Sequence, residues 1–151
     1  MTQIGFYHLQ RLALEQALPK LLEKAQAAGL KVVVMAGSAE RVAFLDDRLW
    51  SYADDAWLPH GSARDGDAQS QPIWLTDHDE NPNAASGLVV CDGVAPAAVA
   101  AFDRCLDLFD GNDDAAVAAA RQRWKRWKAE GHALVYYQQT ERGGWEEKSR
   151  T

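Results

Sequence analysis

The run LKVVVMAG at residues 30–37 constrains the fold of this chain more than any other feature. Three consecutive valines followed by a methionine leave no polar position along the strand that the run predicts. A strand that is apolar on both sides is typical of a sheet whose two faces are both covered by helices. The run therefore predicts an inner strand of a largely parallel sheet.

Helical and extended patterns alternate around this run. One helical stripe ends at Gly29, and a second begins after Ser38, which can cap it. A longer helix is expected over residues 113–130, capped by Asn112. A short helix is expected near residues 95–104. Further strands are expected at residues 4–9, 72–77, 86–93, 105–110 and 132–137.

Because strands alternate with helices, the fold class is expected to be α/β, a three-layer sandwich with a largely parallel sheet. We expect residues 1–140 to form a single α/β domain, which is within the usual size of one domain. Residues 141–151 are polar apart from one tryptophan and are expected to form a loose C-terminal tail.

Charge is distributed unevenly along the 151 residues, whose net charge is −6. Residues 1–120 hold 8 Lys/Arg and 18 Asp/Glu, whereas residues 121–151 hold 8 Lys/Arg and 4 Glu. A generally acidic surface repels nucleic acid at long range. A local basic patch on such a body suits an acidic protein segment better than a long stretch of DNA.

Motifs that carry catalytic chemistry are missing from the sequence. The turn AGSAER after the valine run lacks the glycines and the lysine of a phosphate-binding loop. The four histidines are far apart and fit no compact metal-ligand pattern. We therefore expect no enzyme activity, no cofactor and no metal.

The cellular location follows from equally simple features. No apolar run approaches the roughly 20 residues that a membrane helix needs. Cys91 and Cys105 lie in apolar runs without a metal-binding or redox spacing. Two free, buried thiols are expected, in a reduced cytoplasmic protein.

The segment RQRWKRWK at residues 121–128 contains five cations and two tryptophans and no acid. At helical spacing Val117, Ala120, Trp124 and Trp127 form one stripe, flanked by a line of cations at Arg121, Lys125 and Lys128. One interpretation is a core-facing stripe with a solvated rim. The other is an aromatic pocket for a peptide with an apolar last residue, whose carboxylate an arginine holds. The pattern alone leaves both open.

Two segments carry a resemblance to a known family. The middle segment RVAFLDDRLWSYADDAWLPHG has family positions at Asp46, Leu49, Trp50, Trp57, Leu58, Pro59 and His60. The late helix has them at Arg121, Trp124, Lys125, Trp127 and Gly131. With FYHL near the start and GGWEEK near the end, the chain resembles the chi subunit of bacterial DNA polymerase III.

The resemblance implies a non-catalytic accessory subunit on a nucleotide-binding-like fold that lacks a phosphate loop. It implies binding to the acidic C-terminal tail of single-stranded-DNA-binding protein, and so an indirect association with single-stranded DNA. It also implies a link to the clamp-loader complex through the small psi subunit. The sequence leaves open whether a psi partner exists here and which surface would bind it.

The family pattern assigns the tail pocket to Arg121, Trp124 and Lys125, with Trp57 as an aromatic wall. Val117 stands where the family often has a lysine. Either Lys128 or Arg64 supplies the missing charge, or the affinity for the tail is lower. Two alternatives remain: direct binding of single-stranded nucleic acid through the basic aromatic helix, and a nucleotide-using enzyme on the same fold.

Overall fold

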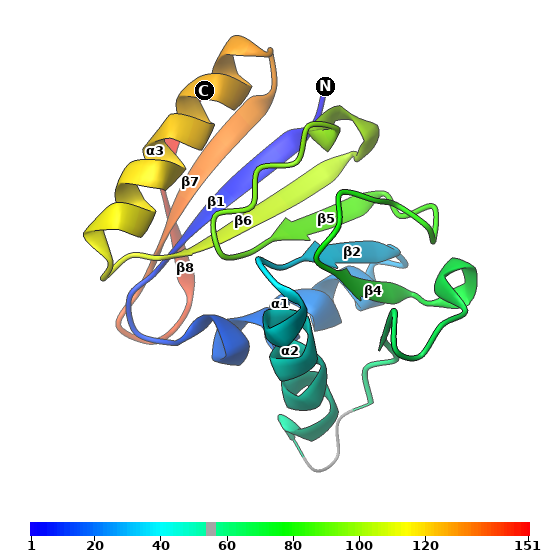
Figure 1. Ribbon diagram of the computed structural model, residues 1–151. Coiled ribbons are helices and arrows are strands. Elements are labelled where there is room, and N and C mark those ends of the chain that lie inside the picture. The colour runs from blue at the N-terminus through cyan, green and yellow to red at the C-terminus, as the bar shows by residue number, and fades with distance from the viewer. Residues whose placement is uncertain (54–56) are drawn as a thin grey trace.

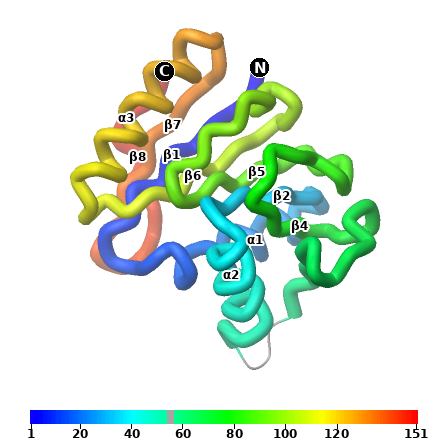
Figure 2. The backbone as a smooth tube through the Cα atoms, in the orientation of Figure 1, coloured from blue at the N-terminus to red at the C-terminus, as the bar shows by residue number. Residues whose placement is uncertain are grey.

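The computed structural model describes residues 1–53 and 57–151 (Figures 1 and 2). Its strands are β1 (Gln3–Leu9), β2 (Val32–Met35), β3 (Gly61–Ser62), β4 (Ile73–Thr76), β5 (Gly87–Val90), β6 (Arg104–Asp110), β7 (Ala133–Gln139) and β8 (Trp145–Arg150). They form one sheet in the order β3-β4-β2-β5-β6-β1-β7-β8. Neighbouring strands are parallel except for β7 and β8, which are antiparallel. The prediction of a largely parallel sheet is confirmed.

Helices cover both faces of this sheet. The helices are α1 (Leu14–Ala27), α2 (Ala39–Ser51) and α3 (Asp114–Ala129). Leu22 of α1 and Leu45 of α2 pack in one core cluster, whereas Trp127 of α3 belongs to a second cluster on the opposite face. Figure 1 shows α3 running alongside β7, away from α1 and α2. The predicted three-layer α/β sandwich is confirmed.

Strand β2 occupies the inner position that its sequence predicts. It pairs with β4 on one side and β5 on the other, and all four of its residues are buried. Val32 and Val34 face the cluster under α1 and α2, whereas Val33 and Met35 face the opposite cluster. Because the side chains alternate between two covered faces, every position has to be apolar.

The helix ends follow local chemistry, with one correction. Gly29 ends α1 with a φ of +76°, and the Ser38 hydroxyl accepts a hydrogen bond from the Arg41 amide at the start of α2, as expected. Asn112 does not cap α3. The cap is Asp113, whose carboxylate accepts hydrogen bonds from the amides of Ala115 and Ala116 and complements the helix dipole.

Two further expectations are wrong. Residues 95–104 do not form an α-helix, because only Val99–Ala101 make a 3-10 turn before β6 begins. The C-terminal segment is not a loose tail, because residues 145–150 form β8. Trp145 anchors this strand by packing edge-on against Tyr7, with ring centroids 5.0 Å apart. The charged residues of β8 suit an exposed edge strand.

Candidate functional site

Helix α3 turns its aromatic stripe toward the sheet. Trp127 is completely buried, Ala120 is buried, and Val117 and Trp124 are half-buried. Arg121 and Lys125 lie on the exposed flank. The predicted division into an inward apolar stripe and an outward cationic flank is therefore confirmed.

Arg123 breaks the simple pattern, because it is buried although it lies among exposed cations. Its Nε donates a hydrogen bond to Asp107 Oδ2 at 2.6 Å, and its Nη2 donates to Asp107 Oδ1 at 2.9 Å. Burial raises the pKa of the Asp107 carboxyl, and the Arg123 guanidinium opposes that rise. Sequence reasoning missed this pair, although the single acid in the middle of the apolar β6 strand was a signal for it.

A cavity of about 360 Å³ lies between α3 and the sheet. Its lining residues are Phe6, Phe109, Val117, Ala120, Arg121, Trp124, Tyr136 and Ser149. The Phe6 and Trp124 rings meet edge-on with centroids 5.3 Å apart, and Tyr136 lies 6.5 Å from Trp124. We call this cavity the α3 pocket. Four of its eight lining residues are aromatic and two more are apolar, so it can accept an apolar side chain.

Arg121 brings positive charge to the α3 pocket. Among residues 1–53 and 57–151, no carboxylate forms an ion pair with its guanidinium. Burial raises the pKa of Tyr136, and the charge of Arg121 opposes this rise. Arg121 therefore lies close enough to the pocket for its charge to act there, and its donors remain available to an anion.

His8 contacts two residues that line the pocket, and Gly111 leaves room for the His8 ring. His8 Nδ1 hydrogen-bonds with the Tyr136 hydroxyl, and the His8 ring packs edge-on against Phe109. Burial lowers the pKa of His8; the Gly111 backbone and the charge of Asp110 oppose this, and the charge of Arg121 adds to it. A Cβ atom at Gly111 would lie 1.9 Å from His8 Cδ2, so only glycine leaves room for this ring.

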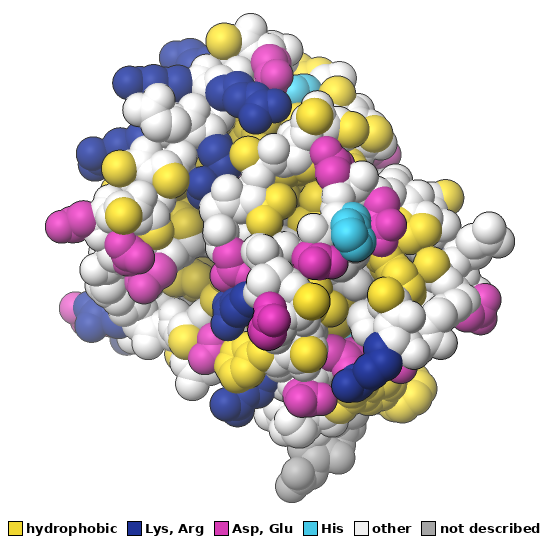
Figure 3. All heavy atoms as spheres, in the orientation of Figure 1, with side chains coloured by type: hydrophobic (Ala, Val, Ile, Leu, Met, Phe, Trp, Pro, Cys, Tyr) yellow, Lys and Arg dark blue, Asp and Glu magenta, His cyan; other side chains and the backbone are white. Residues whose placement is uncertain are grey.

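The other cations of α3 extend the positive surface. Lys125 lies with Arg121 and Trp124 around an adjoining hollow of about 340 Å³. Lys128 is exposed and lines neither cavity. In Figure 3, Lys and Arg side chains gather at the upper left, where α3 lies, whereas acidic side chains spread over the rest of the visible face.

Comparison with known proteins identifies the family. A family model described as DNA polymerase III chi subunit, HolC, matches residues 1–135. The chain belongs to this family. It is 34% identical over 90 residues to a probable DNA polymerase III subunit chi of Rickettsia prowazekii, covering 60% of this chain. That match spans only 54% of the Rickettsia protein.

A second relative matches over more of its length. The DNA polymerase III subunit chi of Pseudomonas aeruginosa is 29% identical over 137 residues, which cover 89% of this chain and 94% of that protein. The resemblance seen in the sequence to the chi family is therefore confirmed. Strand β8 lies beyond the residues that the family model matches.

The chi-family residues do not all meet in one place. Trp57 does not line the α3 pocket but packs on Trp50, with ring centroids 5.9 Å apart, beyond the end of α2. In Figure 1 that end of α2 lies at the bottom of the molecule, whereas α3 lies at the upper left. Trp57 is 72% exposed. The structure therefore does not bring Trp57 to the cavity that Arg121 and Trp124 line.

Arg64 is also elsewhere, because its Nη2 lies 3.3 Å from Asp46 Oδ2 near α2. It does not supply the charge that is missing at Val117. The aromatic walls come instead from Phe6, Phe109 and Tyr136, which sequence reasoning did not name. Parallel pairing of β6 and β7 with β1 brings them together, and the sequence pattern of single strands does not contain that neighbourhood.

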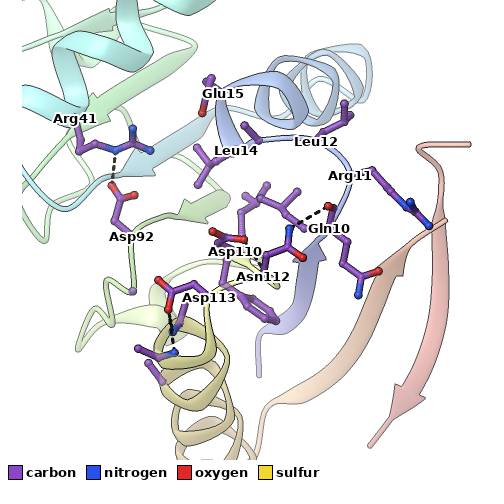
Figure 4. Close-up of a pocket in the computed structure, with 18 of the residues that line it drawn as sticks. Gln10, Arg11, Leu12, Leu14, Glu15, Arg41, Asp92, Asp110, Asn112 and Asp113 are labelled. Carbon is purple, nitrogen blue, oxygen red and sulfur yellow. Dashed lines mark hydrogen bonds and ion pairs between the residues drawn. The ribbon is translucent and has the colours of Figure 1, made fainter. Parts of the chain in front are cut away.

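A larger cavity of about 700 Å³ lies at the carboxyl ends of β5, β6 and β1 (Figure 4). Open α/β sheets commonly bind nucleotides at this edge. Here the Asp92 carboxylate accepts a hydrogen bond from the Gly37 amide at 3.0 Å and pairs with Arg41 Nε at 3.2 Å. The Asp92 carboxylate therefore already occupies the Gly37 amide before α2, which a bound phosphate would need as a hydrogen-bond donor.

Metal ligands, cysteines and membrane-spanning helices are the remaining features of the described residues that bear on function. Within the part of the chain that the structure describes, no group of three or more His, Cys, Asp or Glu side chains is placed to hold a metal ion. Cys91 and Cys105 are both free and buried, as predicted, and burial raises the pKa of each thiol. No helix among the described residues has the length and apolar character needed to cross a bilayer.

Proposed function

We propose that this chi-family chain is a non-catalytic replication subunit that binds the acidic C-terminal tail of single-stranded-DNA-binding protein in the α3 pocket. The observation that carries the proposal is the guanidinium of Arg121, which has no ion-pair partner among the described residues, beside a cavity lined in part by aromatic rings. A C-terminal residue with an apolar side chain presents a carboxylate next to that side chain. The pocket offers a partner for each.

The energies of the two contacts are complementary. A charge-assisted hydrogen bond from Arg121 to a carboxylate contributes about 1.5–3 kcal/mol. Burial of one large apolar side chain contributes about 1.5–3 kcal/mol. The carboxylate contact fixes the chain end at the mouth of the pocket. Burial of the last side chain in the pocket favours peptides whose last residue is large and apolar. Together they select a free C-terminus over an internal segment.

The acidic residues that precede the chain end would meet the outer face of α3. Lys125 lies beside Arg121 and has no ion-pair partner within the described ranges. Lys128 extends the same flank one turn further along the helix. These exposed cations raise the association rate and add modest affinity, because solvent screens them.

Direct binding of single-stranded nucleic acid is the second candidate, since α3 combines cations with tryptophans. The structure gives it less support. Trp127 is fully buried and Trp124 packs against Phe6, so neither ring is a free platform on which bases can stack. The net charge of −6 also opposes a nucleic-acid track.

The tail contact would connect the polymerase to template DNA that is covered by single-stranded-DNA-binding protein. This chain would not need to touch the DNA itself. We propose that the chain acts in the cytoplasm within the DNA polymerase III assembly, where a psi subunit would join it to the clamp loader. No cofactor is needed for this role, because recognition depends only on side chains of the protein.

A pull-down with single-stranded-DNA-binding protein tests the proposal. The intact partner and a version lacking its acidic tail are compared after nuclease treatment, which removes bridging DNA. Capture of the intact partner alone is the expected result. Equal capture of both versions would place recognition outside the tail, and capture that requires DNA would favour the nucleic-acid alternative.

A further inference from the structure

Strand β8 forms part of the wall of the α3 pocket. Ser149 lies on β8 and lines the cavity together with Tyr136 of the neighbouring strand. Other parts of the lining come from α3, β1 and β6. The pocket is therefore enclosed on one side by an edge strand that lies outside the residues matched by the family model.

A β-bulge determines which residue of β8 reaches this position. Tyr137 pairs with Glu147, but the residue before it, Tyr136, pairs with Ser149. Lys148 is therefore left without a partner in the ladder, and the register shifts there. In a regular ladder Lys148 would stand opposite Tyr136. A bulge inserts one extra residue and changes where the following side chains point. Here it brings a small serine, in place of a lysine, opposite the tyrosine of the pocket.

The next residue of β8 serves a different surface. Arg150 pairs with Val135 and lines a cavity on the opposite face of the sheet, together with Tyr7 and Tyr137. Successive residues of a strand point to opposite faces. Substitutions at residues 149 and 150 therefore alter the same strand, but they affect opposite faces of the sheet.

We propose that β8 is a specificity element of the α3 pocket, with Ser149 setting the size of the C-terminal side chain that the pocket accepts. This inference rests on the proposed binding of an acidic peptide. The small Ser149 side chain leaves room between β8 and α3 for a large apolar or aromatic residue. A larger side chain at this position narrows that room without touching Arg121.

Selectivity between peptides tests the proposal. Labelled acidic peptides that differ only in their last residue, Ala, Leu or Phe, are titrated against wild type, Ser149→Leu and Arg150→Leu. Wild type binds the Phe peptide most tightly. Ser149→Leu weakens binding of the Phe peptide by about tenfold or more, because overpacking a filled site is costly. It changes binding of the Ala peptide less than about threefold, since a small residue still fits.

Arg150→Leu is the matched control, and it leaves the order and the affinities of the three peptides unchanged. A merely structural effect of Ser149→Leu would weaken all three peptides equally, and that result would overturn the proposal. So would unchanged selectivity. If Arg121→Ala weakens binding while Ser149→Leu has no effect, the proposed function stands and only the role of β8 fails. If wild type binds none of the peptides, both fail.

Discussion

Arg123 on α3 and Asp107 on β6 form a two-point ion pair inside the protein, with N–O distances of 2.6 and 2.9 Å. Arg123 immediately precedes Trp124 and lies two residues after Arg121. The pair fixes α3 against the sheet at the level of the pocket. It therefore links the stability of the fold to the position of the residues proposed to bind the peptide.

Loss of one partner of this pair should destabilise the protein strongly. Asp107→Ala leaves a buried guanidinium without a counter-charge, so the free energy of unfolding should fall by about 3–5 kcal/mol. The double variant Asp107→Leu/Arg123→Met replaces both charges by apolar groups and should recover most of this loss. Urea unfolding measures both. A loss below about 1 kcal/mol, the value of an exposed pair, would contradict the role of the buried contact.

Gly111→Ala should also destabilise the fold, by about 1–3 kcal/mol, because its Cβ has no room. The new atom would lie 1.9 Å from the His8 ring and 2.7 Å from the Leu9 carbonyl oxygen. Gly144→Ala is the control, since its Cβ would meet only Thr140 Oγ1 at an ordinary 3.5 Å. Thermal melts should separate the two variants; equal melting temperatures would show that the space around His8 is not tight.

The half-buried His8 should make stability depend on pH. Burial lowers its pKa from the ordinary value of 6.5; the Gly111 backbone and the charge of Asp110 oppose this shift, and the charge of Arg121 adds to it. The unfolded chain therefore binds a proton more readily than the folded protein. The stabilising contribution is complete above pH 6.5 and is lost as the pH falls through that value toward the lower pKa of the folded state.

His8→Gln removes this titration and keeps a polar side chain beside Tyr136. Chemical unfolding between about pH 8 and pH 5 should show a shallower decline in the variant than in wild type. Parallel curves for the two proteins would mean that His8 titrates in the folded state as it does in the unfolded chain.

The lysines of α3 should contribute in order of their distance from the pocket. Lys125 borders the hollow beside Arg121, so Lys125→Ala should weaken binding of an acidic peptide by up to about 1 kcal/mol. Lys128→Ala should have a smaller effect, and added salt should reduce both contributions. Titrations at low and high salt measure them. A larger effect at Lys128 would place the acidic flank nearer the end of the helix.

The sequence predicted those features whose cause is local or periodic. The valine run predicted β2, the stripe from Val117 to Trp127 predicted the inward face of α3, and Ser38 predicted the start of α2. In each case the pattern itself determines burial or capping. The family resemblance then directed attention to Arg121 and Trp124, which the fold brings to one cavity.

Features that depend on long-range pairing were not predicted. Tyr136 and Ser149 meet across the β7–β8 ladder, and the bulge there depends on register. Trp57 was assigned to the pocket by analogy, yet it follows α2 on another part of the surface. The C-terminal segment was expected to be loose because its composition is polar. That argument omitted the open edge of β7 and the anchoring contact of Trp145 with Tyr7.

The central claim is that Arg121 holds the terminal carboxylate of an acidic peptide in the α3 pocket. Its most direct test is a fluorescence titration of a labelled acidic peptide with wild type, Arg121→Ala and Arg126→Ala. Arg126 is the matched control, because it is an exposed arginine of the same helix that pairs with Glu130 and does not line the pocket. Arg121→Ala should weaken binding by roughly ten- to a hundredfold, whereas Arg126→Ala should bind as wild type does. If a folded Arg121→Ala variant binds the peptide with wild-type affinity, Arg121 does not hold the carboxylate and the proposed site is wrong.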